Sequence, residues 1–254
     1  MAVVSEYDRR KGVAAQTLPE HTRVIYNGVE VEPFAGPVSR QAQSLLRLLY
    51  AGRVSSDKGV DTAVRALGLL AKEQRHRSIR LSIAGDGPED YRDELRGLAE
   101  SMGIADQVEF LGRLPREAMP IVMRGHQVLL LTSIYPEAFS RVVLEAMASG
   151  MVVVGTLVGG TGEILEHEGT GLTFTAGDAS DLAQKIECLA DDSELRTRLA
   201  GQAQERVIRE FDFKRMIERL ESFLSEALSD VRAAGQRAWS QEVGGQERES
   251  ILSR

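Results

Sequence analysis

Cysteine is nearly absent from this sequence, since the 254 residues contain only Cys188. One cysteine cannot build a disulfide framework, which excludes a small secreted fold held by disulfides and fits a reducing, cytoplasmic environment. Cys188 lies in the stretch Leu182–Leu189, whose apolar spacing is that of an amphipathic helix. We therefore expect its thiol to be buried.

Long apolar runs and excess positive charge are also missing. No run approaches the ~20 apolar residues that a membrane-spanning helix needs. We therefore expect a cytoplasmic protein and leave open a peripheral association with the inner face of the membrane. The net charge is −7 and no basic stripe stands out, which argues against nucleic acid as a main partner. An anionic ligand stays compatible with this charge, because local donors hold a phosphate.

The usual catalytic clusters do not occur. The four histidines are scattered, and none has a Cys or His partner at metal-ligand spacing, so no metal site is predicted. His126, at the start of a strand, is interpreted as structural. No Ser-His-Asp arrangement or nucleophile elbow is found. Any catalysis by this chain would rest on positioning and electrostatics.

Short apolar runs alternate with helical patterns from residue 45 onward. The expected strands are Leu45–Ala51, Ile79–Ala84, Val108–Leu111, Val128–Thr132, Met151–Gly155 and Leu172–Phe174. The expected helices are Val60–Lys72, Glu89–Ser101, Pro115–Met123, Phe139–Ser149, a short one near Gly162–His167, then Ser180–Leu189, Ser193–Glu210 and Phe213–Leu228. This alternation predicts an α/β fold, a Rossmann-like parallel sheet of about six strands with helices on both faces. Ligands of such sheets bind at the carboxyl ends of the strands.

Both ends of the chain differ from this central part. Residues 1–40 hold too few apolar positions for a core and are interpreted as the remnant of a preceding N-terminal domain plus a linker. Residues 41–228 form the predicted Rossmann-like domain with its C-terminal helices. Residues 229–254 are rich in Gln, Glu, Arg, Ser and Gly, and we expect a disordered or loosely helical polar tail.

Two acids eight residues apart are the most informative pair. Glu137 follows an apolar strand, and Glu145 lies on the helix expected over Phe139–Ser149, which Gly150 is well placed to end. The unpaired amides at the start of that helix suit a phosphate, so the acids could hold hydroxyls on either side of a diphosphate. Alternatively, Glu145 is an ordinary i, i+4 partner of Arg141. Spacing alone favours this second interpretation, and the rest of the chain reverses it.

Three glycine-containing turns follow strands. The first, Gly52–Gly59, carries Arg53 and Lys58, which suit a pyrophosphate as a bidentate fork and a mobile point charge; surface cations beside a turn are the alternative. The second, Gly85–Pro88, is interpreted as a structural turn. The third, Gly159–Glu163, could wrap a ligand or be a flexible turn, and both interpretations stay open.

Together these motifs resemble the C-terminal half of a GT-B glycosyltransferase of the large retaining family 4, which uses nucleotide-sugars. The resemblance runs from about Val24 to about Leu228. It is carried by Val24-Ile25-Tyr26-Asn27-Gly28-Val29 with Phe34, Gly52-Arg53 with Lys58-Gly59, Ala84-Gly85-Asp86-Gly87-Pro88, Val108-Glu109-Phe110-Leu111-Gly112, Glu137 with Glu145, Gly159-Gly160 with Glu163, and Gly169-Thr170-Gly171-Leu172 with Gly177-Asp178.

The resemblance implies a role for each matched residue. Gly52, Arg53 and Lys58 would hold the donor diphosphate, and Glu145 the ribose hydroxyls. Glu137 would hold sugar hydroxyls together with the segment Ala138, Phe139, Ser140 and Arg141, while Arg113 and Leu114 would border the base. Glu137, Arg53 and Lys58 would be the catalytic residues. The resemblance implies no cofactor and no metal, with the two cations and the helix dipole stabilising the departing phosphate.

The sequence also departs from the family. Its members have two such domains, and we expect this chain to start at the last strand of the first one, so that the acceptor half is not visible. We expect a glycosyltransferase donor half that is inactive alone and that needs a missing or separately encoded N-terminal domain. The alternative is a non-catalytic nucleotide-binding module. A Rossmann oxidoreductase is disfavoured because the dinucleotide fingerprint is missing after the first strand.

Overall fold

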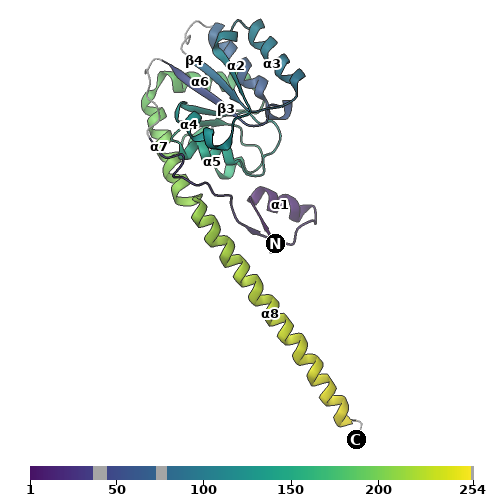
Figure 1. Cartoon of the computed structure of the whole chain (residues 1–254). Helices are drawn as coiled ribbons and strands as arrows, with labels where there is room; N and C mark the ends of the chain where they lie inside the picture. The colour runs from purple at the N-terminus through teal and green to yellow at the C-terminus, as the bar shows by residue number, and fades with distance from the viewer. Residues whose placement is uncertain (37–44, 73–78, 253–254) are drawn as a thin grey trace.

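A parallel sheet between two layers of helices forms the body of the molecule in the computed structural model, which describes residues 1–36, 45–72 and 79–252 (Figure 1). The strands are β3 (Leu46–Ala51), β4 (Ile79–Ala84), β5 (Val108–Gly112), β6 (Val128–Leu131), β7 (Val152–Gly155) and β8 (Gly171–Thr173). All neighbouring strands are parallel and their order is β5-β4-β3-β6-β7-β8. The Rossmann-like sheet of about six strands is confirmed.

The strand order reverses direction at β3. The chain moves outward from β3 through β4 to β5, returns to the other side of β3 with β6, and then moves outward to β8. The loops that follow β3 and β6 therefore leave neighbouring strands at the carboxyl edge. This topological switch point is where open α/β sheets bind ligands.

Each face of the sheet has its own apolar core. One face is covered by α2 (Val60–Lys72), α3 (Glu89–Ser101) and α6 (Ala179–Asp191), and the other by α4 (Met119–Arg124), α5 (Arg141–Ala148) and α7 (Ser193–Glu210). In α2 the buried Val60, Ala63, Val64 and Leu67 follow the i, i+3, i+4, i+7 spacing that turns one side of a helix to a core. The bounds predicted for α2, α3 and α7 are confirmed.

Several other predicted elements differ from the structure. The stretch expected as one helix over 115–123 consists of the 3₁₀ turn η3 (Arg116–Ala118) and α4. The helix expected near 162–167 is the 3₁₀ turn η4 (Gly160–Glu163); the remaining 3₁₀ turns are η1 (Ser56–Lys58) and η2 (Ala105–Gln107). The expected burial of Cys188 is wrong. Its thiol is exposed, because α6 turns Leu182, Ile186 and Leu189 to the core and Cys188 lies on the opposite side.

Helix α5 begins later than predicted. Ser140 is its N-cap, so Phe139 precedes the helix. The segment before it is extended because Glu137 forms an isolated parallel bridge with Gly159 and the Phe139 side chain is buried in the core. The predicted stop is confirmed, since Gly150 has φ 73°, the left-handed conformation of a helix-ending glycine.

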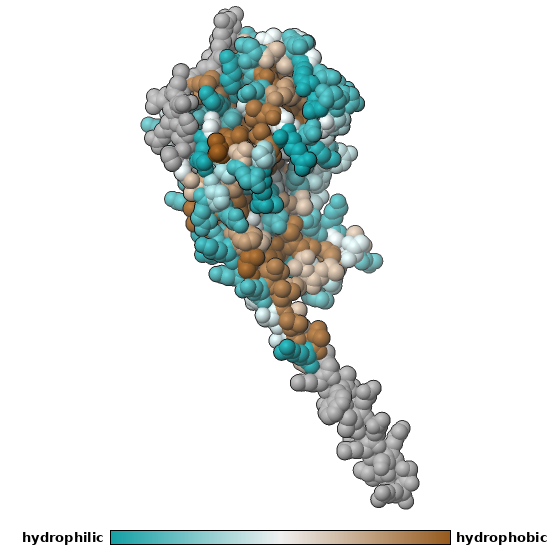
Figure 2. Space-filling model, viewed as in Figure 1, coloured by the Kyte–Doolittle hydropathy of each residue, from teal (hydrophilic) through white to brown (hydrophobic). Residues whose placement is uncertain are grey.

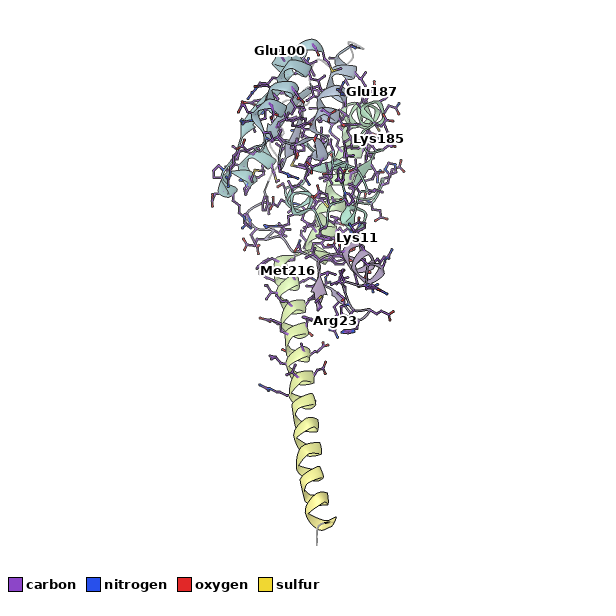
Figure 3. The ribbon with its side chains drawn as sticks, turned by 90° about the vertical axis from the view of Figure 1, so that its right-hand side faces the viewer. Lys11, Arg23, Glu100, Lys185, Glu187 and Met216 are labelled. Carbon is purple, nitrogen blue, oxygen red and sulfur yellow. The ribbon has the colours of Figure 1, made fainter. Side chains whose placement is uncertain are left out.

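A small N-terminal piece lies beside the main sheet. β1 (Ala2–Val3) pairs in parallel with β2 (Arg23–Val24), and α1 (Glu6–Ala14) connects them. Helix α1 was not predicted; its first turn is capped by the Ser5 hydroxyl, which accepts from the Asp8 amide at 3.0 Å. Figure 3 shows this piece, with Lys11 and Arg23, beside the start of α8 near Met216. The predicted boundary between residues 40 and 41 lies outside the described residues.

Helix α8 (Phe213–Leu252) is one continuous helix that projects away from the body (Figure 1). The prediction ended this helix at Leu228 and expected a disordered or loosely helical tail. The helix instead continues past Leu228, because residues 229–252 contain no proline and are rich in Ala, Glu, Gln and Arg, which favour helix. Across the described ranges, no helix combines the length and apolar character needed to cross a membrane.

Candidate functional site

The loops that follow β3 and β6 are joined at the switch point of the sheet. The Thr132 hydroxyl donates to the Lys58 carbonyl at 2.7 Å, and the Ile134 amide donates to the Asp57 carbonyl at 3.0 Å. Gly59, with φ 60°, lets the two backbones approach, because a Cβ there would lie 2.3 Å from the Thr132 carbonyl oxygen. This contact fixes where both loops present their side chains.

An ion pair joins the two loops. Lys58 Nζ lies 2.6 Å from Glu137 Oε1, and both side chains are largely buried. The Ser133 hydroxyl also donates to Glu137 Oε1. Sequence reasoning placed Lys58 and Glu137 in one site but missed Ser133, for which a serine at the end of a strand gives no distinctive signal. Glu137 thus has its carboxylate held by a cation and a hydroxyl.

Arg53 also has an acidic partner. Its Nη2 lies 2.7 Å from Asp57 Oδ2, and its side chain is 64% exposed. The hydrogen bond from the Ser55 hydroxyl, together with the Arg53 and Lys58 cations, outweighs burial and holds the pKa of Asp57 below its ordinary value. Tyr50 fixes the backbone of this turn, because its hydroxyl donates to the Arg53 carbonyl at 2.5 Å. Arg53 is therefore anchored by its backbone and has an exposed guanidinium.

A cavity of about 400 Å³ lies at this edge of the sheet. Its wall brings together five of the predicted site residues: Gly52, Arg53, Arg113, Leu114 and Glu145. It also contains residues to which sequence reasoning assigned no ligand contact: Ala51, Ala84, Gly85, Asp86, Met119 and Val142. The cavity has cationic, acidic and apolar walls, which suits a ligand with anionic, hydroxylated and flat apolar parts.

The Gly85–Pro88 turn has the structural role expected for it. A Cβ on Gly85 would lie 1.7 Å from the Gly52 carbonyl oxygen, and one on Gly87 would lie 1.8 Å from that of Val54. The Val54 amide donates to the Asp86 carbonyl at 2.9 Å. Because Gly85 and Asp86 also line the cavity, the same turn shapes its wall.

Glu145 separates two cavities. It lines the first one and also a second, of about 720 Å³, where Arg141 and Arg116 lie beside residues of the linker and α8. Burial raises the pKa of Glu145 above its ordinary value, against the opposing effect of the Arg141 and Arg116 cations. Arg141 Nη2 lies 3.7 Å from Glu145 Oε1, so the i, i+4 contact exists while the acid also faces the first cavity.

The remaining predicted residues form the segment between Glu137 and α5. Ala138 is exposed, Ser140 is buried, and the Phe139 ring stacks on Tyr26 with centroids 5.1 Å apart. These residues do not line the first cavity. Within the described part of the chain, the amides of Phe139 and Ser140 donate no backbone hydrogen bond. They leave free donors next to the first turn of α5.

The glycines of the Gly159–Glu163 turn pack against that segment. A Cβ on Gly159 would lie 2.2 Å from the Glu137 carbonyl oxygen, and one on Gly160 would lie 2.1 Å from that of Ala138. The close approach explains why glycine is needed at both positions. Among the described residues, His, Cys, Asp and Glu side chains form no group of three suited to a metal ion.

The chain matches the model of the family described as glycosyl transferases group 1 over residues 38–206. It is 30% identical to the glycogen synthase of Mycobacterium tuberculosis over 191 residues, which cover 75% of this chain and 45% of that protein. The chain spans about half the length of the curated relatives it matches.

Solved structures of similar proteins contain the same fold. HepE of Anabaena, in complex with UDP-glucose, aligns with a TM-score of 0.80 and 28% identity over 89% of this chain and 63% of HepE. The C-terminal domain of the group 1 glycosyl transferase LpcC from Francisella tularensis aligns with a TM-score of 0.66 and 23% identity. That alignment covers 73% of this chain and 99% of the LpcC domain, and at this identity it shows the fold alone.

Proposed function

The chain belongs to the family of group 1 glycosyl transferases, and from this premise we propose that it supplies the half of a transferase that binds the nucleotide-sugar donor. The observation that carries the proposal is the contact between Lys58 and Glu137 at the switch point. There a cation suited to phosphate and an acid suited to sugar hydroxyls lie 2.6 Å apart.

The donor would lie across the carboxyl edge of the sheet. Arg53 and Lys58 would bind its diphosphate, helped by the free amides before α5 and by the dipole of that helix. Glu145 would accept hydrogen bonds from the ribose hydroxyls in the first cavity, and Glu137 from the sugar hydroxyls. The base would lie beside Arg113 and Leu114, on the wall of the same cavity.

The chemistry proposed for this half is electrostatic. The two cations and the helix dipole would stabilise the negative charge that develops on the departing phosphate, without a metal ion. We propose transfer with retention of configuration. The acceptor hydroxyl would attack the anomeric carbon of the sugar on the face that the phosphate leaves, and an oxygen of that phosphate would accept the hydroxyl proton. Ser140 and Arg141 would contribute amides to the same phosphate.

A partner domain is part of the proposal. The chain spans about half of its relatives, and α8 carries exposed apolar side chains at Leu220, Leu224, Leu228 and Val231. Figure 2 shows an apolar band that runs from the body onto the first turns of α8. A missing or separately encoded N-terminal domain would cover part of this band and supply the acceptor site.

Without such a domain we expect the purified chain to bind donor and to lack measurable transferase activity. Holding two reactants in register supplies ~7–11 kcal/mol of a barrier, and half a cleft cannot do so. Because the chain spans only half of its relatives, a non-catalytic nucleotide-binding module is the second candidate. Acceptor-dependent turnover that returns when an N-terminal domain is added would favour the transferase over that module.

Calorimetric titration tests the donor-binding function. The ligands are UDP, GDP and ADP, their sugar conjugates, and NAD. We expect one nucleoside diphosphate and its sugar conjugate to bind. The HepE complex with UDP-glucose supports uracil as the first base to try. Tight binding of NAD with no response to any nucleoside diphosphate would contradict the proposal.

A further inference from the structure

Glu163, at the end of η4, joins parts of the chain that are far apart in sequence. Its Oε2 accepts from the Glu6 amide and its Oε1 from the Tyr7 amide, each at 2.8 Å. Both amides belong to the first turn of α1, where a helix leaves its own amides unpaired. Burial, together with the nearby Glu163 carboxylate, raises the pKa of the Tyr26 hydroxyl to about 12. One side chain therefore holds the first turn of α1 against η4.

The turn that carries Glu163 also supports the segment of Glu137. The Gly160 amide donates to the Glu137 carbonyl at 2.7 Å. A Cβ on Gly160 would lie 2.1 Å from the Ala138 carbonyl oxygen and 3.0 Å from the Ser5 Cβ. The start of α1, the turn and the segment are thus in direct contact, with no room for a side chain between them.

Tyr26 supports the same segment from a second direction. Its ring stacks on Phe139 with centroids 5.1 Å apart and an interplanar angle of 24°. Phe139 in turn packs on Phe211, with ring centroids 5.6 Å apart. Because the Glu163 carboxylate lies near the Tyr26 hydroxyl and the turn that carries Glu163 binds Glu137, both supports of the segment meet at this residue.

We propose that Glu163 is a positioning residue that fixes the Glu137–Phe139 segment in the geometry that binds the donor sugar. The inference rests on the proposed function, in which Glu137 contacts the sugar hydroxyls. Arg53, Glu145 and Arg113, which would bind the rest of the nucleotide, are held by other loops and by α5. Glu163 therefore affects the sugar more than the nucleoside diphosphate, because the diphosphate depends on the segment only through Lys58, which pairs with Glu137, and the amides before α5.

The test compares two ligands on the full chain. The probe is the first of the pairs UDP and UDP-glucose, GDP and GDP-mannose, or ADP and ADP-glucose that the wild-type chain binds. Glu163→Gln keeps the size of the side chain but turns an NH₂ group toward an amide that needs an acceptor. We expect the affinity gained from the sugar to fall roughly tenfold, as for a misplaced binding group, while the affinity for the diphosphate alone falls by a clearly smaller factor.

Two further variants separate positioning from stability. Glu166→Gln, on an exposed acid three residues away, is the matched control and should leave both affinities unchanged. Tyr26→Phe keeps the ring stacking and removes only the hydroxyl. The affinity gained from the sugar should therefore fall by a smaller factor than in Glu163→Gln. It also tests the inference if Glu163→Gln does not fold.

The outcomes are distinct. A wild-type chain that binds neither member of any pair contradicts the proposed function itself. If the wild-type chain binds both members of a pair, the variants decide. The inference is overturned if Glu163→Gln and Tyr26→Phe weaken the binding of both ligands equally, or if they weaken the binding of neither. A lower melting temperature with an unchanged ratio of the two affinities would likewise overturn it, because Glu163 would then be only a cap for α1.

Discussion

Lys58 Nζ and Glu137 Oε1 lie 2.6 Å apart although the two residues are 79 positions apart in sequence. The contact exists because β3 and β6 are neighbours in the sheet and their loops meet at its carboxyl edge. Each charge of the pair compensates the other. The proposed diphosphate and sugar would share this pair, which makes it the centre of the site.

Removing either cation should weaken diphosphate binding. We expect Arg53→Ala and Lys58→Ala each to cost ~1.5–3 kcal/mol of binding free energy for the nucleoside diphosphate, the range for hydrogen bonds to charged groups. Calorimetry should show little change for the uncharged nucleoside. Arg65→Ala is a matched control, because Arg65 pairs with Asp61 at i, i+4 as Arg53 pairs with Asp57. Equal losses for nucleoside and diphosphate would mean that the loop is only structural.

Glu145→Gln should discriminate between ribose and deoxyribose. The carboxylate is proposed to accept from the ribose hydroxyls in the first cavity, so the variant should weaken binding of the ribonucleotide more than that of the 2′-deoxy nucleotide. Competition titrations with both ligands measure the difference. If Glu145 serves only Arg141, the pair contributes at most ~0.5 kcal/mol to stability, and the two nucleotides would bind to the variant as they bind to the wild type.

Glu145 also predicts a pH dependence of stability. Burial raises its folded-state pKa above the unfolded value of 4.5, so its contribution to stability is present below that value and is lost as pH rises through the folded-state pKa. Glutamine stays neutral throughout. Relative to the wild type, Glu145→Gln should therefore gain unfolding free energy between pH 4 and pH 7, as measured by denaturant titration. A difference that stays constant with pH would show that burial does not perturb this carboxyl.

Two glycine substitutions should have opposite effects. Gly85→Ala places a Cβ 1.7 Å from the Gly52 carbonyl oxygen at a backbone φ of 149°, which we expect to destabilise the chain by about 1–3 kcal/mol and to weaken nucleotide binding. Gly97→Ala, in α3 with nothing within 4 Å of the new Cβ, should stabilise by ~0.5–1 kcal/mol. Thermal unfolding and titration check both. Similar melting temperatures for the two variants would refute the role given to the Gly85 turn.

The sequence predicts the elements whose stability is local or follows the apolar pattern. Helix α2 was predicted to the residue because its apolar spacing is regular and Gly59 precedes it. Helix α1 was missed because it has no buried residue; Ser5 caps it, and Glu163, 157 positions from Glu6, binds its first turn. The role of Glu163 could not be predicted without the fold.

The candidate site likewise has features that the sequence predicts and features that depend on the fold. The motif residues gather at one edge of the sheet, as expected from strands whose carboxyl ends meet there. Their partners were not predictable, because the contacts of Ser133 with Glu137 and of Tyr26 with Phe139 depend on the loop geometry. Helix α5 starts later than predicted because a backbone bridge from Glu137 to Gly159 extends the preceding segment, and the apolar pattern carries no trace of this bridge.

A crystal structure of the chain with the nucleoside diphosphate that it binds tests the donor site most directly. We predict the diphosphate between Arg53, Lys58 and the start of α5, the ribose hydroxyls within hydrogen-bonding distance of Glu145, and the base beside Arg113 and Leu114. A nucleotide bound elsewhere on the chain, or one in the first cavity with its phosphates away from both Arg53 and Lys58, would contradict the account.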